Sequence, residues 1–365
     1  MEVLLVSPER AGLELDEFLC LEHPLFHKGF VRRAIRDGHV TVDGAPVLPS
    51  HRLRDGEVVL VQLHELEDQG LLPTGPTAPE IPVAVLHEDD ALVVVDKPAG
   101  VSTEPERWAP EAACMAGALR ELALARSSRG DRLDWRPRLV HRLDKDTTGC
   151  LVAAKTLEAE RALREAFDAG EVTKTYLALV EGEWPAGDWS EIDAPIGEAS
   201  ELSRKERRRL GKTGRRAGRM AVLPDGEGRP ARTLVRLHTA WRGFSLVEAR
   251  PVTGRTHQIR VHLASRGFPL AVDPLYGRRD ELLLSELKAG YRSKPGRPER
   301  PLVGRLTLHA QTIVLPRLDG TGQADPVDDP VEAPGAPGTL RVEAPLPADL
   351  LRITRQLAKV RPNRS

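Results

Sequence analysis

The chain has 365 residues, of which 40% are hydrophobic, 29% are charged and only 4% are aromatic, and its formal net charge is -1. That length allows two or three domains with ordinary buried cores. Cys20, Cys114 and Cys150 are far apart and odd in number, which excludes a disulfide framework or a zinc site and predicts reduced thiols in a cytoplasmic protein. Acidic residues interrupt the apolar positions near the start, and there is no apolar run of about 18 residues, so neither a signal peptide nor a transmembrane helix is predicted.

Residues 12–62 are predicted to form a small helix-and-hairpin module. Apolar residues at helical spacing predict a helix over 28–36, which Gly38 ends, and β-branched runs separated by turn residues predict a hairpin over 39–61. One side of the predicted helix is cationic: it carries Lys28, Arg32, Arg33 and Arg36.

The Pro- and Gly-containing segment 64–82 predicts a linker to a second domain over 83–360. Short strands and isolated helices alternate irregularly there, which predicts an α+β fold with a mixed, mainly antiparallel sheet flanked by helices. Two stretches look like insertions. Residues 201–219 hold nine Lys/Arg against two Glu, and residues 319–338 are rich in Pro, Gly and Asp. The predicted strands are 83–86, 91–96, 150–154, 176–181 and 244–250, and the predicted helices are 111–126, 157–169, one from Thr253 or Thr256 to 265, and 349–360.

Ionisable residues gather beside apolar strands in two clusters, HRLDKDTTG at 141–149 and RPVTGRTHQIRVH at 250–262. Such clusters indicate either an active site or a structural ion-pair network, and their local sequence leaves both open. A zinc helix is excluded, because His257 and His262 are five residues apart instead of four. Neither a phosphate-binding loop, a Ser-centred elbow nor a dinucleotide fingerprint occurs. What remains is an aspartate, Asp144, flanked by cations.

The first cluster is similar to the HRLDxxTSG signature of the RluA-type pseudouridine synthases, with Thr148 where Ser is usual. Phe268 and Val272 stand where that family commonly has His and Gly. Residues 12–62 resemble the S-four-type RNA-binding domain. Further blocks that resemble the RluA-type family follow in order: 88–100 (EDDALVVVDKPAG), 174–182 (KTYLALVEG), the second cluster, 273–277 (DPLYG), 308–310 (LHA) and 344–350.

The resemblance implies an RNA-binding domain over 1–63 and a pseudouridine synthase domain over 83–360. Such an enzyme isomerises uridine in RNA to pseudouridine and needs no cofactor or metal. Asp144 is then the essential carboxylate, which attacks the ribose or the base, or abstracts a ribose proton. Tyr176 is implied to stack on the target base, and Arg260 to keep the carboxylate charged.

RNA contacts are implied for several other cations. Arg142 would fill the space that the flipped uridine leaves, since a guanidinium stacks flat and still donates hydrogen bonds. Lys97 is expected either to contact phosphate or to lie solvated in a turn, and Arg255 is the second candidate for the cation beside Asp144. The remaining expected RNA contacts are His141, Arg255, His257, Lys28, Arg32, Arg33 and Arg36.

The expected substrate of this monomeric enzyme is large-subunit ribosomal RNA, which most family members with the N-terminal domain modify, and tRNA is the alternative; no membrane partner is expected. A non-catalytic RNA-binding or ribosome-assembly protein is a second hypothesis, and the presence of Asp144 and Tyr176 weighs against it. A glycosidase would need a second carboxylate, for which Asp146 is the only nearby candidate. The composition of the basic insertion predicts an arm with two alternative roles. It either becomes ordered when it binds RNA, or it is held electrostatically by the acidic insertion.

Overall fold

The computed structural model describes residues 1–23, 26, 28–62, 81–105, 113–127, 135–200, 219–224, 226–292, 298–318 and 338–363. The linker up to residue 80 and the two insertions, except for their end residues 219 and 338, lie outside these described residues. The chain forms two compact units, one from 1–83 with 104–138 and the other from 84–103 with 139–365. The segment 104–138, which the sequence groups with the second domain, therefore folds with the N-terminal unit.

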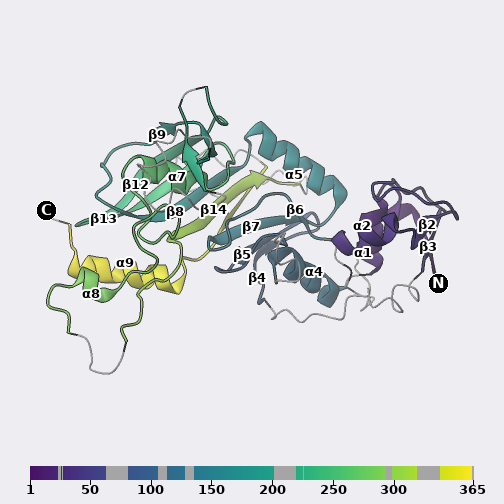
Figure 1. Cartoon of the computed structure of the whole chain (residues 1–365), viewed down its shortest axis with the longest axis horizontal. Helices are drawn as coiled ribbons and strands as arrows, with labels where there is room; N and C mark the ends of the chain where they lie inside the picture. Colours follow the sequence, from purple (N-terminus) through teal and green to yellow (C-terminus); the bar gives the residue numbers. More distant parts are fainter. Residues whose placement is uncertain are drawn as a thin grey trace. The chain divides into compact units, whose positions relative to one another are not determined.

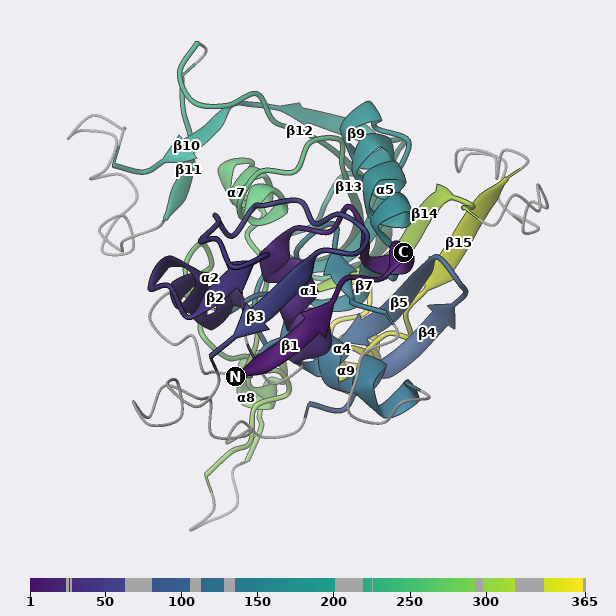
Figure 2. The ribbon, with the colours of Figure 1, turned by 90° about the vertical axis from the view of Figure 1, so that its right-hand side faces the viewer.

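The N-terminal unit combines helices with a three-stranded antiparallel sheet of order β1-β3-β2 (Figure 2). The predicted helix and hairpin strands are confirmed, whereas β1 and α1 are absent from the sequence prediction. Side chains of α1 such as Phe18 and Leu19 are buried and form part of the small core. The elements are β1 (Glu2–Leu5), a 3-10 turn (Pro8–Arg10), α1 (Leu15–Glu22), α2 (Lys28–Arg36), β2 (Val40–Val42), β3 (Val58–Val61) and α4 (Met115–Arg126).

The second unit is built on one large sheet of order β4-β5-β7-β14-β8-β13-β12-β9, with β15 paired to β14 (Figure 1). Only the β7–β14 pair is parallel among the described pairs of this sheet, so the predicted mixed, mainly antiparallel α+β fold is confirmed. The short strand β6 (Arg138–Leu139) contains the point, between residues 138 and 139, where the first unit's range ends and the second unit's range resumes. The other elements are β4 (Ala84–Glu88), β5 (Leu92–Lys97), β7 (Thr148–Ala154), α5 (Leu157–Ala169), β8 (Thr173–Glu181), β9 (Ser190–Asp193), β10 (Ile196–Glu198), β11 (Met220–Val222), β12 (Arg232–Trp241), β13 (Phe244–Pro251), α7 (Gln258–Ser265), α8 (Leu284–Leu287), β14 (Leu308–Pro316), β15 (Thr339–Glu343) and α9 (Ala348–Val360).

Two helices cover this sheet, each over its own apolar cluster. The helix α5 packs Leu163 against β5, β7, β14 and β15, and α9 packs Ile353 against β8 and β13. Because side chains alternate along a strand, Leu177 and Leu179 face α9, while Tyr176 faces the opposite side of the sheet. Among the described residues, no helix is both long and apolar enough to cross a membrane.

One row of residues runs across the sheet beside the site. Lys97 pairs with Gly149, Gly149 with Ala310, Ala310 with Tyr176, and Tyr176 with Ala249. At Gly149, φ is +109°, and an added Cβ would lie 2.1 Å from the carbonyl oxygen of Ala310. A glycine therefore permits the close approach of β7 to β14, which brings the loop before β7 near Tyr176.

We predict that Gly149→Ala destabilises the protein by about 3 kcal/mol or more, because backbone strain and overpacking each cost about 1–3 kcal/mol. Gly170→Ala is the matched control: φ there is +76° but nothing lies within 4 Å of an added Cβ, so it should cost only the roughly 1–2 kcal/mol of the left-handed conformation. Chemical denaturation measures both. Equal losses would contradict the close-approach argument.

A buried histidine adjoins this row. The Nε2 of His309 lies 3.3 Å from the carbonyl oxygen of Ala344, and its Nδ1 lies 2.9 Å from Oγ1 of Thr148. Since a carbonyl only accepts, Nε2 carries the proton and Nδ1 accepts from the Thr148 hydroxyl. Burial lowers the pKa of His309 from 6.5 to about 4. The folded protein therefore keeps this side chain neutral.

Protonation should consequently destabilise the fold. The unfolded chain takes up a proton on His309 below its ordinary pKa of 6.5, and the folded chain does so only near about 4. Stability is therefore lost as pH falls through this window, by about 2 kcal/mol between about pH 7 and about pH 5. Denaturation of His309→Gln at both pH values should show a correspondingly smaller loss, and His238→Gln, at an exposed position, should behave like the unsubstituted protein. An unchanged pH dependence in His309→Gln would refute this assignment.

Candidate active site

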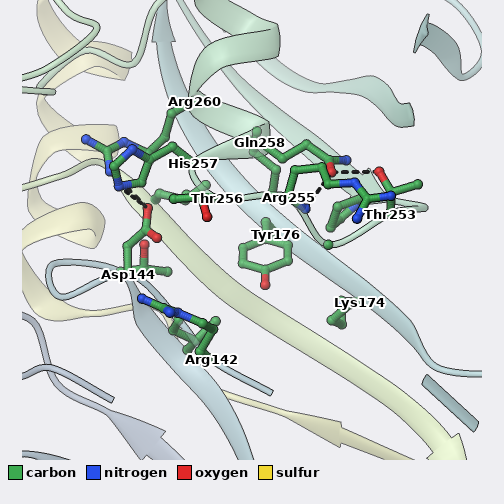
Figure 3. Close-up of a pocket in the computed structure, with 16 residues that line it drawn as sticks. Arg142, Asp144, Lys174, Tyr176, Thr253, Arg255, Thr256, His257, Gln258 and Arg260 are labelled. Atoms are coloured by element: carbon green, nitrogen blue, oxygen red, sulfur yellow. Dashed lines mark hydrogen bonds and ion pairs between the residues drawn. The ribbon is translucent and has the colours of Figure 1, made fainter. Parts of the chain in front are cut away.

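A pocket lies where the loop before β7, strand β8 and the loop before α7 meet (Figure 3). Tyr176 stands in its middle, and the only carboxylate among the described lining residues is that of Asp144. Against this one acid stand several basic groups, so the pocket attracts anions. The basic lining residues are Arg142, Lys174, Arg255, His257 and Arg260.

Asp144 is held by a buried guanidinium. Arg260 donates from Nη1 to Oδ2 of Asp144 at 2.9 Å, and its Nε and Nη2 each donate to one oxygen of Asp273 at 2.8 Å. The side chain of Asp273 is fully buried, whereas that of Asp144 is 25% exposed. Burial alone would lower the pKa of Arg260, but the hydrogen bonds and charges of the two carboxylates raise it above its ordinary value. Arg260 thus stays charged, and Asp144 faces the pocket.

The second carboxylate is itself fixed by a turn. Oδ1 of Asp273 accepts from the backbone N–H groups of Leu275 and Tyr276 at 2.8 and 3.1 Å. The ring of Tyr276 lies 5.0 Å from the Arg260 guanidinium, a cation–π contact. These bonds leave Arg260 little freedom, so they also fix the direction from which Asp144 is bound.

His257 lies beside Arg260, near the same oxygen of the Asp144 carboxylate (Figure 3). Its Nε2 is 4.0 Å from Oδ2 of Asp144, and its Nδ1 is 2.8 Å from the hydroxyl of Tyr276. Burial lowers the pKa of His257, although the charge of Asp144 opposes this shift. Its φ of +56° is in the left-handed region, which is rare for a residue with a side chain. A strained residue beside a reactive group is typical of functional sites.

The loop that carries Asp144 is fixed through its backbone. The ammonium of Lys97 donates to three carbonyl oxygens, those of Pro98, Val101 and Lys145, at 2.8, 2.6 and 2.8 Å. Both expectations for Lys97 are wrong, because its side chain is fully buried and is used inside the protein. Burial lowers its pKa to about 8. Thr103 fixes Leu143, the residue directly before Asp144. The Thr103 hydroxyl donates to the carbonyl oxygen of Leu143 at 2.7 Å, and the Leu143 N–H donates to Oγ1 of Thr103 at 3.1 Å.

Gln258 fixes the loop before α7. Its Oε1 accepts from the Thr253 hydroxyl and the backbone N–H of Arg255. Its Nε2 donates to the carbonyl oxygen of Arg232 and to Oγ1 of Thr233. The prediction that Thr253 or Thr256 caps this helix is wrong, because His257 is the N-cap residue and Thr253 bonds to Gln258 instead. Arg255 lines the pocket, but its Nε donates to the carbonyl oxygen of Pro230, and Arg260 is the cation on Asp144.

Tyr176 presents a neutral phenol to the pocket. Its ring is 8% exposed and lies between Ala310 and Ala249 in the row across the sheet. Burial, and then the charge of Asp144, raise the pKa of Tyr176 above its ordinary value. Both neighbours in the row have small side chains, and the ring borders the pocket.

Two sets of predicted RNA contacts lie elsewhere. His141 is outside the pocket: it accepts from the N–H of Val152 at 3.0 Å and stacks on Phe167, and burial lowers its pKa to about 3. In the N-terminal unit, Lys28 and Arg32 both bind the buried carboxylate of Asp16, at 3.3 and 2.6 Å. The other two cations of that helix, Arg33 and Arg36, are exposed.

Known proteins are similar to this chain in sequence and in fold. Residues 91–265 match the family described as RNA pseudouridylate synthase. Ribosomal large subunit pseudouridine synthase D of Xanthomonas campestris pv. campestris is 36% identical over 356 residues, which cover 95% of this chain and 90% of that protein. The chain belongs to the RNA pseudouridine synthase family. It is therefore an isomerase that acts on RNA, as the resemblance predicts.

Two further relatives and a second domain agree with this membership. Residues 15–59 match the S4 domain. Ribosomal large subunit pseudouridine synthase C of Escherichia coli strain K12 is 29% identical and covers 99% of this chain and 98% of that protein. Human RNA Pseudouridylate Synthase Domain Containing 4 shares the fold, with a TM-score of 0.50 and 23% identity over 75% of this chain and 92% of that chain.

Sequence reasoning missed several residues of this pocket and its supports. Asp273 and Tyr276 lie in the DPLYG block, whose recurrence in the family was the available signal. Lys174 begins the block that contains Tyr176, and a strand period of two residues places both on one face. Thr103 carries no sequence signal, because it contacts Leu143 from a distant segment.

We predict that Asp273→Asn destabilises this enzyme by about 3–5 kcal/mol and lowers its activity, since it leaves the buried Arg260 without its main partner. Asp349→Asn provides a matched control. It breaks another bidentate pair, with Arg305, whose acid is 24% exposed and does not line the pocket. That variant should lose less stability and keep its activity. Similar losses in both variants would contradict the special role of Arg260.

Proposed function

We propose that this pocket isomerises uridine to pseudouridine in large-subunit ribosomal RNA, with Asp144 as the reacting carboxylate. The observation that carries the proposal is the hydrogen bond from buried Arg260 to Asp144, beside the ring of Tyr176. The ribosomal substrate is supported by the relatives named as large-subunit synthases, which match nearly the whole chain. We also propose that the enzyme acts in the cytoplasm and as a monomer.

The chemistry needs only groups of this chain and the RNA. The N1–C1′ bond of uridine breaks, the uracil turns, and C5 bonds to C1′; a proton leaves C5 and one is gained at N1, so atoms balance. Asp144 either attacks the ribose or the base, or abstracts a ribose proton. In all three routes the carboxylate must be charged and aimed, and Arg260 serves both needs.

Tyr176 and Arg142 handle the flipped nucleotide. The neutral ring of Tyr176 offers a stacking face to the uracil, and its hydroxyl remains a hydrogen-bond donor. Arg142 is exposed at the pocket rim, from where its guanidinium can fill the space that the base leaves in the RNA. Unstacking a base costs a few kcal/mol, and stacking by the guanidinium offsets part of that cost.

The domain at 1–63 contributes affinity for the RNA backbone. Arg32, Arg33 and Arg36 are all exposed on α2, but Arg32, like Lys28, is engaged by Asp16. We therefore assign the phosphate contacts of this helix to Arg33 and Arg36. The domain at 83–360 holds the catalytic groups Asp144, Tyr176 and Arg260, with Arg142, Arg255 and His257 as RNA contacts.

Asp144→Asn tests the proposal, because it keeps the shape of the side chain and removes its charge. Pseudouridines are mapped in total RNA from cells without the gene, and from the same cells carrying the unsubstituted gene or Asp144→Asn. We expect one or more large-subunit positions to depend on the gene and not to be restored by the variant. Tritium release from uridine-labelled RNA should fall by more than about tenfold.

The outcomes separate the alternatives. Missing modifications only in tRNA would reassign the substrate. Modification unaffected by the gene, with RNA binding intact, would favour a non-catalytic RNA-binding or assembly protein. Full activity of Asp144→Asn would remove that residue from the reaction.

A further inference from the structure

Lys174 shares the pocket face of the sheet with Tyr176. The two residues are separated by one position in β8, so both side chains project from the same side. In Figure 3, Asp144 lies on one side of the Tyr176 ring and Lys174 on the other. Lys174 is therefore a pocket residue that stands away from the reacting carboxylate.

Lys174 is half-buried, and its ammonium has no acidic partner among the described residues. It lies 5.1 Å from the centre of the Phe167 ring, and it makes no hydrogen bond or ion pair within the described part of the chain. Burial lowers its pKa, and no carboxylate opposes that shift. A desolvated cation without an anion is costly, and a weak cation–π contact offsets only part of that cost.

The charges of the other basic pocket residues are satisfied by protein partners or by water. Arg260 binds two carboxylates, and Arg255 is anchored at its Nε by Pro230. Arg142 is exposed, so water solvates it. His257 faces the Asp144 carboxylate at 4.0 Å. Among these described pocket cations, Lys174 is the half-buried one that has neither a hydrogen bond nor an ion pair.

We propose that Lys174 binds a backbone phosphate of the RNA beside the flipped uridine, a role that rests on the proposed function. An ammonium is a compact point charge that suits phosphate, whereas uracil is neutral. Because Lys174 lies across Tyr176 from Asp144, the bound phosphate stays apart from the carboxylate, which limits the repulsion between the two anions. The uracil is thereby held over the ring of Tyr176 while its ribose faces Asp144.

Salt dependence provides the first test. Binding and turnover are measured with an in-vitro-transcribed large-subunit RNA fragment at several KCl concentrations, using Lys174→Met in the full chain. Loss of one phosphate contact should make the slope of log affinity against log salt shallower by about 0.7–0.9. KM should rise roughly tenfold with kcat little changed, because the contact exists before and during reaction.

A neutral phosphate provides the second test. Methylphosphonate replaces in turn each phosphate next to the target uridine in a short RNA. At one position the replacement should weaken binding by the unsubstituted enzyme roughly tenfold. The same replacement should cost Lys174→Met nothing further, as a double-mutant cycle between contacting groups requires.

Two variants control for structure. Lys174→Arg should restore the salt slope, since it keeps the charge, and Lys359→Met removes an exposed lysine of α9 and should leave slope and KM unchanged. An unchanged slope in Lys174→Met, or methylphosphonate effects equal in both enzymes, would overturn the proposal. So would a loss confined to kcat with a shifted pH profile, which would indicate proton transfer. Binding is measured without turnover, so an inactive enzyme would count against the proposed function while the slope still tests Lys174.

Discussion

The guanidinium of Arg260 donates to two carboxylates at once, at 2.8 Å to Asp273 and 2.9 Å to Asp144. It joins α7 to Asp273, which follows 13 positions later, and to the loop before β7, whose Asp144 is 116 positions away in sequence. A buried cation needs anions around it, and the reaction proposed for Asp144 needs a charged carboxylate held by a fixed cation. The single guanidinium of Arg260 meets both requirements. The pocket forms only where these segments come together, and Arg260 therefore ties the fold to the chemistry.

The rest of the site removes freedom from Asp144 through the backbone. Lys97 and Thr103 bond to main-chain groups on both sides of it, and Gly149 lets the following strand pass close to β14. The backbone that carries Asp144 is thus fixed, and so is the guanidinium that binds its carboxylate. Groups aimed before the substrate arrives need no reorganisation during reaction, which is a principal source of enzymatic rate enhancement.

Charge is organised locally, although the whole chain is almost neutral at -1. The described pocket lining holds one carboxylate among five basic side chains, and α2 leaves Arg33 and Arg36 exposed. RNA responds to such local potential and not to the net charge. Lys28 and Arg32, which lie on the same helix, bind Asp16 instead. Spacing on a helix therefore could not tell which cations an acidic side chain of the same unit engages.

The sequence by itself determined the family, the α+β class, most strands and helices, and the group Asp144, Tyr176 and Arg260, because these lie in contiguous blocks with strong periodicity or a family signature. Only the tertiary structure decided which partners the individual side chains around these residues have. Lys97 turned inward, His141 became a neutral acceptor, His257 capped α7, and Asp273 and Thr103 joined the site. The physical reason is that burial and partner choice depend on segments far away in the chain, such as the 161 positions that separate Gly149 from Ala310 across one parallel pair.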